Sequence, residues 1–144
     1  PDSAPFYLQE LQDLINKHPQ VSIGSITGRW YAMDRDNHTQ RTGATYTMLT
    51  QGEKSQFESW QDALSYYYKN KITDMFIPPT LLEQSAVIHD GDGIIFTNFR
   101  KERERQLVSR FLSEGPPLSF LISPIPYDPQ FSNPVLLETP VRSG

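Results

Sequence analysis

Segments that favour helix alternate with short apolar runs along this chain, and this alternation limits the possible folds more than any other feature. Helices are expected over residues 3–17, 38–50, 55–70 and 102–113. Strands are expected over the short apolar runs 21–27, 86–89, 94–96 and 118–122. Parallel strands need helical crossovers, which this order supplies. The sequence therefore predicts an α/β domain with a mainly parallel sheet and flanking helices.

Local signals set the expected boundaries of several elements. Ser3 can cap the first helix, in which Tyr7, Leu11, Leu14 and Ile15 fall on one face. Residues 55–58 form a capping box that predicts a helix as far as about Asn70. The runs 94–96 and 118–122 are typical of buried strands, and the prolines that follow exclude a further long helix.

Charge and composition exclude several classes of protein. The formal net charge is -4, whereas a nucleic-acid-binding protein usually carries a basic excess, so we expect no nucleic-acid partner. No run approaches the ~20 apolar residues of a membrane span, and no membrane partner is expected. The chain has no cysteine, which excludes disulfides and thiolate metal sites and fits a cytoplasmic location.

Two arginine-containing clusters follow predicted strands. Residues 28–36 follow the strand that ends near Thr27, and residues 98–103 follow the strand that ends near Phe96. Ligands of open α/β sheets bind beyond the carboxyl ends of strands, and arginine suits bidentate binding of carboxylate or phosphate. Arg100 and Arg103 are three residues apart, so they share a face if both are helical. At a helix N-terminus, which is already partly positive, such cations favour a bound anion.

The same clusters also permit a purely structural interpretation. Arg35 lies between Asp34 and Asp36, and Arg103 lies between two glutamates, so surface ion pairs would account for both. The residues alone leave the anion site and the ion pairs as open alternatives.

Three blocks of residues resemble the cofactor-independent phosphoglycerate mutases. The first block, residues 28–36, matches G-R-Y-Y-A-M-D-R-D with Trp30 in place of Tyr. The second block, residues 73–80, follows T-D-E-F-V-x-P-T with Met75 and Ile77 as departures. The third block, residues 90–103, follows D-G-D-x-x-I-F-x-N-F-R-x-D-R, with Lys-Glu in place of the usual Pro-Asp. The resemblance is close over 28–103 and faint after about residue 112.

Family members interconvert 3-phosphoglycerate and 2-phosphoglycerate in glycolysis through a phosphoserine. The resemblance implies that four arginines hold the phosphoglycerate: Arg29, Arg35, Arg100 and Arg103. It places the serine and two manganese ions in a second domain. None of the three histidines of this chain lies in a ligand pattern, so no metal, cofactor or catalytic residue is expected within it.

Residues 1–144 are accordingly expected to be an incomplete part of the phosphotransferase domain, cut from a larger two-domain enzyme. The resemblance implies a D-G-R-D-x-P-P segment just before Pro1, a parent enzyme that is a monomer, and no mutase activity in the isolated chain. Two other interpretations stay open. One is a free-standing module that binds a phosphorylated ligand or an acidic peptide, and the other is a structural domain whose arginines form internal ion pairs.

Overall fold

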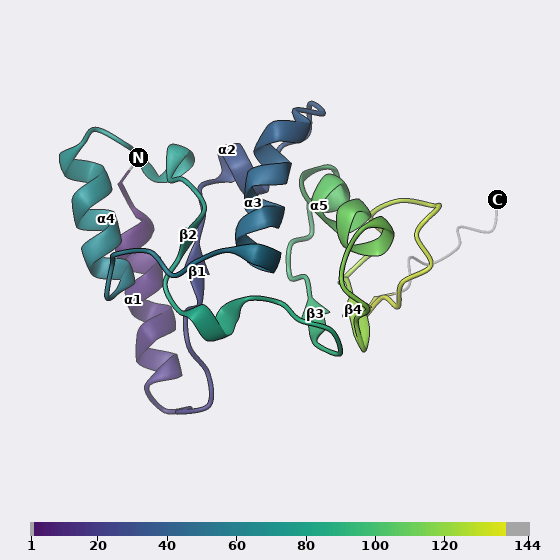
Figure 1. Ribbon diagram of the computed structural model, residues 1–144, viewed down its shortest axis with the longest axis horizontal. Coiled ribbons are helices and arrows are strands. Elements are labelled where there is room, and N and C mark those ends of the chain that lie inside the picture. The colour runs from purple at the N-terminus through teal and green to yellow at the C-terminus, as the bar shows by residue number, and fades with distance from the viewer. Residues whose placement is uncertain (1, 138–144) are drawn as a thin grey trace.

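The computed structural model of the chain describes residues 2–137, so Pro1 and the end of the predicted 1–144 domain lie outside that range. Five α-helices and four short strands follow one another in this part (Figure 1). The helices are α1 (Ala4–Ile15), α2 (Arg29–Ala32), α3 (Thr39–Gln51), α4 (Trp60–Lys69) and α5 (Lys101–Ser113). The strands are β1 (Ser25–Ile26), β2 (Thr80–Leu81), β3 (Gly93–Ile95) and β4 (Phe120–Ile122). Two 3₁₀ turns, η1 (Asp74–Phe76) and η2 (Gln84–Ala86), flank β2.

The strands form two separate two-stranded sheets, so the prediction of a mainly parallel sheet is wrong for the described residues. β1 and β2 are antiparallel, and Ser25 pairs with Leu81. β3 and β4 are parallel, with Ile94 opposite Leu121, and α5 forms the crossover between them. The chain is thus a mixed α/β structure rich in helix, with two small sheets rather than one.

Two predicted strands are shorter than expected or absent. Only residues 25–26 of the run 21–27 pair as a strand, because the Val21 N–H donates to the carbonyl of His18 in a turn. The run 86–89 is not a strand: its first residue ends η2, and the Ile88 N–H donates to the carbonyl of Leu49 near the end of α3.

All four predicted helices are present, with differences at their boundaries. α4 begins at Trp60, and its cap is Ser59, whose hydroxyl accepts the Asp62 N–H at 3.1 Å. The predicted cap, Ser55, donates its own N–H to the carbonyl of Leu81 at 2.8 Å. Ser55 therefore belongs to the extended connection beside β2, and the capping-box prediction placed the start of the helix too early.

The buried face of α1 also differs from the predicted one. Of the four predicted residues only Ile15 is buried; Tyr7, Leu11 and Leu14 are exposed, whereas Ala4 and Leu8 pack toward the cluster around α4. The Gln12 side chain accepts the indole N–H of Trp60 at 3.1 Å, which ties the same side of α1 to α4.

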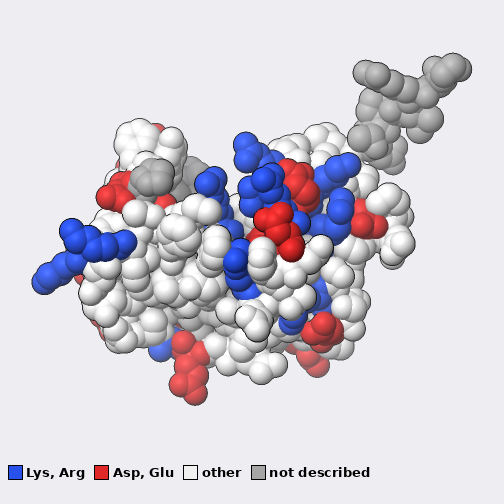
Figure 2. Space-filling model, turned by 90° about the horizontal axis from the view of Figure 1, so that it is seen from above, with Lys and Arg blue, Asp and Glu red and all other residues white. Residues whose placement is uncertain are grey.

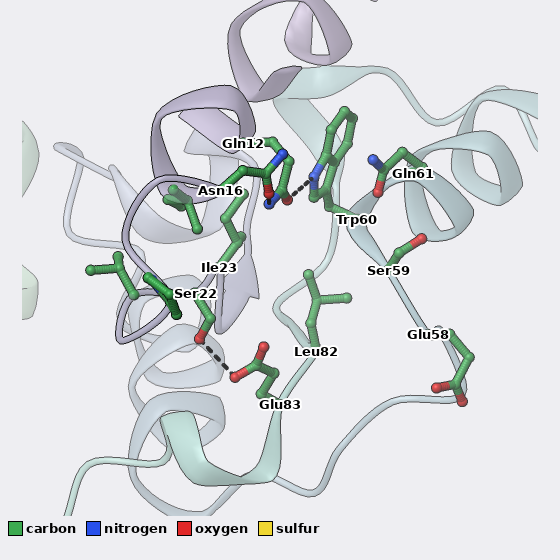
Figure 3. A pocket seen from close by; sticks show the side chains of 13 residues that line it. Gln12, Asn16, Ser22, Ile23, Glu58, Ser59, Trp60, Gln61, Leu82 and Glu83 are labelled. Carbon is green, nitrogen blue, oxygen red and sulfur yellow. Dashed lines mark hydrogen bonds between the residues drawn. The ribbon is translucent and has the colours of Figure 1, made fainter. Parts of the chain in front are cut away.

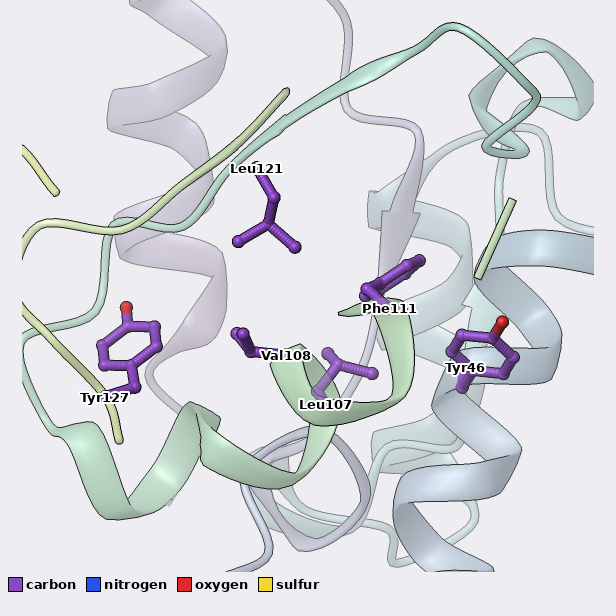
Figure 4. Close-up of a cluster of buried hydrophobic side chains, with 6 residues drawn as sticks. All are labelled: Tyr46, Leu107, Val108, Phe111, Leu121 and Tyr127. Atoms are coloured by element: carbon purple, nitrogen blue, oxygen red, sulfur yellow. The ribbon is translucent and has the colours of Figure 1, made fainter. Parts of the chain in front are cut away.

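Two main hydrophobic clusters lie on either side of α3. The cluster around α4 contains Trp60, Ala63, Leu64, Tyr67, Ile77 and Leu82. The cluster around α5 contains Tyr46, Leu107, Val108, Phe111, Leu121 and Tyr127 (Figure 4). Tyr46 lies on α3, so this helix supplies part of the core on which α5 packs.

The strands at the edge of the second cluster are only partly covered. Leu121 of β4 is buried and Ile94 of β3 is half-buried, but Ile95 is 58% exposed, so the prediction of a buried strand over 94–96 is wrong at that position. None of the helices in residues 2–137 has the length and apolar character needed to cross a bilayer.

Candidate functional site

The first and second blocks meet where α2 begins. The Gly28 N–H donates to the carbonyl of Ile77 at 2.8 Å, and the rings of Trp30 and Phe76 lie 5.3 Å apart. A Cβ atom at position 28 would overlap the backbone of the second block, so only glycine permits this close approach. The start of α2 is therefore fixed against the turn η1.

The first and third blocks meet on the other side of α2. The Arg103 guanidinium donates from Nη1 to the carbonyl of Met33 at 3.0 Å. One turn further along α5, Gln106 donates from Nε2 to the carbonyl of Asp34 at 2.7 Å and to its carboxylate at 2.9 Å. The second block, the third block through Arg103, and Gln106 of α5 thus all contact the segment from Gly28 to Asp34 of the first block.

Asp34 is the hydrogen-bonding centre of this junction. One carboxylate oxygen accepts the backbone N–H groups of Asp36 and His38 and the Gln106 amide, and the other contacts the His38 ring and Arg41 at 2.9 and 3.2 Å. Burial alone raises the pKa of Asp34, but the hydrogen bonds from Gln106 and His38 outweigh it and hold the pKa well below its ordinary value. The carboxylate is therefore ionised and fixes the loop after α2.

A second buried carboxylate supports the residues just before α5. The Asn98 side chain donates to Glu104 at 2.7 Å and accepts the backbone N–H of Arg100 at 3.0 Å. The Tyr127 hydroxyl donates to the Asn98 carbonyl at 2.6 Å. Burial raises the pKa of Glu104, against the effect of the Asn98 hydrogen bond, and burial with the Glu104 charge raises the pKa of Tyr127 to about 12. Asn98 thereby sets the backbone position from which Arg100 extends.

The four predicted arginines belong to the segments that meet at this junction, and their side chains differ in exposure and contacts. Arg29 is the first residue of α2, is exposed, and has its guanidinium 3.7 Å from the sulfur of Met75. Arg35 and Arg100 are exposed, and Arg103 is half-buried. On the face shown in Figure 2, Lys and Arg side chains gather with a few acidic ones over the right-hand half of the molecule.

Arg100 and Arg103 do not share a helical face. α5 begins at Lys101, and Arg100 is its N-cap with ψ 90°, outside the helical range. Arg103 turns toward Met33, whereas Arg100 lines a groove of about 620 Å³ with Phe99 and the segment from Ile125 to Pro129. The counting by three that linked the two arginines requires a helical Arg100, and that condition is not met.

Other arginines form the ion pairs of this region. Their pairs are Arg41 with Asp34 at 3.2 Å, Arg105 with Asp128 at 3.3 Å and Arg110 with Glu114 at 3.7 Å. Arg41 also lies over the Trp30 ring, 3.3 Å from its centroid. Within residues 2–137, no carboxylate lies within 4.0 Å of the four predicted arginines. The predicted flanking acids therefore do not neutralise Arg35 or Arg103.

A pocket of about 380 Å³ between α1 and the start of α4 has the wrong chemistry for an anion (Figure 3). Glu58 and Glu83 contribute to its lining, no lysine or arginine does, and the Glu83 carboxylate accepts the Ser22 hydroxyl at 2.8 Å. The arginine-lined junction is the better candidate for an anionic ligand.

Asp34, Asp36 and His38 place three potential metal-ligand atoms within 4.8 Å of one another. Both carboxylate oxygens of Asp34 already accept hydrogen bonds from the chain, including one from the Arg41 guanidinium. These contacts account for the grouping as part of the loop structure.

Comparison with known proteins agrees with the arrangement of the three blocks. Residues 1–120 match the family described as BPG-independent PGAM N-terminus, or iPGM_N. The chain belongs to this family. It is 45% identical over 138 residues to the 2,3-bisphosphoglycerate-independent phosphoglycerate mutase of Legionella pneumophila strain Lens, covering 89% of this chain and 27% of that protein. It is also 45% identical over 101 residues to the mutase of the same name from Picosynechococcus, covering 70% of this chain and 19% of that one.

The fold has a counterpart among solved structures. The chain resembles a crystal structure of Leishmania mexicana phosphoglycerate mutase at low cobalt concentration, with a TM-score of 0.84 and 22% identity. The match covers 94% of this chain and 29% of that one. The chain spans about a quarter of the length of the curated relatives it matches, and its similarity is to the N-terminal region of the iPGM family.

Sequence reasoning missed the residues that hold the arginine-bearing segments together. Asp34 accepts local N–H groups from Asp36 and His38, but its partner Gln106 lies 72 positions away, and Gln106 belongs to no recognised block of the sequence. One signal was available: Arg103, Gln106 and Arg110 follow helical spacing on α5, and all three contact the segment 33–39.

Proposed function

We propose that this chain is part of the substrate-binding, phosphotransferase domain of a phosphoglycerate mutase that interconverts 3-phosphoglycerate and 2-phosphoglycerate. In this proposal Arg29, Arg35, Arg100 and Arg103 bind the phosphoglycerate. The observation that carries it is the convergence of the three blocks on the segment 28–34, bordered by guanidinium groups that lack carboxylate partners among residues 2–137.

The chemistry of the four side chains fits a ligand with a phosphate and a carboxylate. Guanidinium presents paired N–H donors whose spacing matches either group, and a charged donor and acceptor give stronger hydrogen bonds than neutral ones. Arg103 uses one of its five N–H donors on the Met33 carbonyl, so the others are available to a ligand. The N-terminus of the 13-residue α5 adds partial positive charge beside Arg100 and Arg103.

The residues of this chain bind and orient the ligand in this proposal, and the bond-breaking chemistry belongs elsewhere in the parent enzyme. The serine that carries the phosphate and two manganese ions lie in a second domain, which meets this one over the substrate. The parent enzyme is a cytoplasmic monomer, and the isolated 144 residues bind phosphoglycerate without turning it over.

The test measures kcat and KM for 3-phosphoglycerate on the natural gene product with manganese, for single Arg→Gln variants at the four positions. Loss of a charge-assisted contact of about 1.5–3 kcal/mol lowers kcat/KM by about 10- to 100-fold. Lys101→Gln is the matched control, because it removes one positive charge next to Arg100 from an exposed side chain outside the predicted set. Equal losses for Lys101→Gln and Arg100→Gln would show that only net charge matters and would refute specific binding by the arginine.

The mass of the natural gene product distinguishes this proposal from a free-standing anion-binding module. A product several times larger than 16.5 kDa leaves room for a metal-bearing domain, whereas a product of that size does not. In the second case the arginines would serve binding alone, and the mutase assignment would be wrong.

A further inference from the structure

We propose that Gln106 is a positioning residue: its side-chain amide holds the loop that carries Arg35 at a fixed place on α5, beside Arg103. This inference rests on the proposed function for what the two arginines bind. Its structural part, the attachment of the loop to α5, is open to a test of its own.

The Gln106 amide is fully used, and its partners fix its orientation. Nε2 donates to the Asp34 carbonyl at 2.7 Å and to the Asp34 carboxylate at 2.9 Å. Oε1 accepts the hydroxyl of Thr42, a residue only 2% exposed, at 3.0 Å. The single side chain therefore connects α5 with both the start of the loop after α2 and the first turns of α3.

Two neighbouring residues of the loop are attached to two successive turns of α5. Arg103 holds the Met33 carbonyl at 3.0 Å, and Gln106 holds the Asp34 carbonyl. Arg35 follows directly, so the backbone from which it extends has a set distance from Arg103. Binding groups held in place before the ligand arrives lose less freedom on binding than groups on a loose loop.

Glutamine suits this position better than its charged or apolar isosteres. A glutamate at 106 would place a second carboxylate against that of Asp34, and a methionine would leave the Asp34 carbonyl and the Thr42 hydroxyl without these partners. The depressed pKa of Asp34 is consistent with a close Gln106 contact, because the Gln106 hydrogen bond is the largest of the effects that lower this pKa. The other charged or titratable groups that contact the Asp34 carboxylate are His38 and Arg41.

The experiment compares Gln106→Met and Gln106→Glu with Gln12→Met in the full chain. Gln12→Met is the matched control, because it also removes a glutamine hydrogen bond, that with the Trp60 indole, but at the far pocket. Amide hydrogen exchange is measured at Asp36 and His38, whose N–H groups donate to the Asp34 carboxylate. Titration with 3-phosphoglycerate gives the Kd, and thermal unfolding identifies any variant that is not folded.

Both Gln106 variants are expected to speed exchange at Asp36 and His38 by about tenfold or more and to raise the Kd by a similar factor, while Gln12→Met changes neither. Exchange at wild-type rates in a folded Gln106 variant would overturn the proposal. Faster exchange with an unchanged Kd would also overturn it, since the loop would then move without effect on the ligand. A third outcome separates the two proposals. If neither the wild-type chain nor the longer gene product binds 3-phosphoglycerate, the proposed function is wrong. Faster exchange in the Gln106 variants would still support the attachment of the loop to α5.

Discussion

Replacement of Asp34 by asparagine tests whether the buried carboxylate fixes the loop after α2. The carboxylate accepts five contacts, and its side chain is only 2% exposed. Asparagine keeps the shape of the side chain but has one acceptor oxygen and an NH₂ group. With its oxygen toward Gln106 and the backbone N–H groups of Asp36 and His38, the NH₂ group faces the Arg41 guanidinium, and that contact is lost.

The expected destabilisation combines the lost Arg41 contact with three weaker contacts, whereas the contact with the His38 ring is kept because a ring nitrogen can accept a hydrogen bond from the NH₂ group. A hydrogen bond to a charged group contributes about 1.5–3 kcal/mol, and bonds with a charged partner are about twice as strong as neutral ones. At the low end of these contributions, the sum for Asp34→Asn is about 4 kcal/mol at neutral pH. For a chain of this length, that loss lowers Tm by about 8–16 °C.

The stability difference between wild type and Asp34→Asn should also depend on pH, in a direction set by the pKa of Asp34. The folded-state pKa of Asp34 is depressed below the ordinary value of about 4 that holds in the unfolded chain. The stabilisation is therefore fully present above that ordinary value and is lost as the pH falls toward the folded-state pKa. The difference in unfolding free energy between wild type and Asp34→Asn should be constant from pH 8 to about pH 5 and should narrow below about pH 4.

Urea unfolding of both proteins across this pH range measures the difference directly. Asp36→Asn is the control, since Asp36 contributes only its backbone N–H to the network and its side chain is exposed. The reasoning is refuted if Asp34→Asn is as stable as wild type at pH 7, or if the gap widens as the pH falls.

Three further substitutions, two of them with a control, are tested by urea unfolding. They address the hydrophobic core, the N-cap of α4 and the contact of position 28 with the backbone of the second block. Val108→Ala, at a side chain with no exposed surface, should cost about 2 kcal/mol, whereas Leu112→Ala on the exposed side of the same helix should cost less than half of that. Ser59→Ala should cost about 1 kcal/mol through the lost N-cap, and Ser55→Ala should be neutral or stabilising because the buried Ser55 hydroxyl has no hydrogen-bond partner among the described residues. Gly28→Ala should cost about 1–3 kcal/mol, and a wild-type stability would mean that the backbone of the second block does not lie against position 28.

The helices of this protein could be predicted because their signals are local. Periodicity and cap signals located both ends of α1, α3 and α5 to within two residues, and the start of α4 to within five. The strands could not, since an apolar run becomes a strand only if a partner segment lies beside it. The run 86–89 illustrates this: Ile88 donates its N–H to Leu49 at the end of a helix instead of to another strand.

The exposed side of α1 shows a related limit. Tyr7, Leu11 and Leu14 lie at helical spacing, as do Ala4, Leu8 and Gln12, and only the position of α4 decides which set is buried. An assignment from sequence ranks the two faces of a helix by hydrophobicity, so it predicted that the face with the larger apolar side chains is buried. In the structure the other face packs toward α4, where Gln12 accepts the indole N–H of Trp60.

The candidate site combines local and long-range information in the same way. The four arginines could be found from the sequence, because each lies within a continuous block of residues that resembles the family: Arg29, Arg35, Arg100 and Arg103. Their surroundings could not, since the contacts of the junction join residues about 70 positions apart. Of the flanking acids in the alternative ion-pair interpretation, Asp34 contacts Arg41 and Glu104 accepts a hydrogen bond from Asn98.

The distribution of partners among the arginines separates two roles. Arg41, Arg105 and Arg110 each meet a carboxylate, and Asp34, the acid nearest in sequence to Arg35, is directed to Arg41 instead. A network that served stability alone would pair Arg35 with its adjacent acids, because an exposed pair costs little to form. The fold instead uses a buried, ionised Asp34 to shape the loop and leaves the Arg35 guanidinium exposed. The Arg35 guanidinium thus has no carboxylate within 4.0 Å among residues 2–137, an arrangement that is understandable if it meets an anion from outside the described chain.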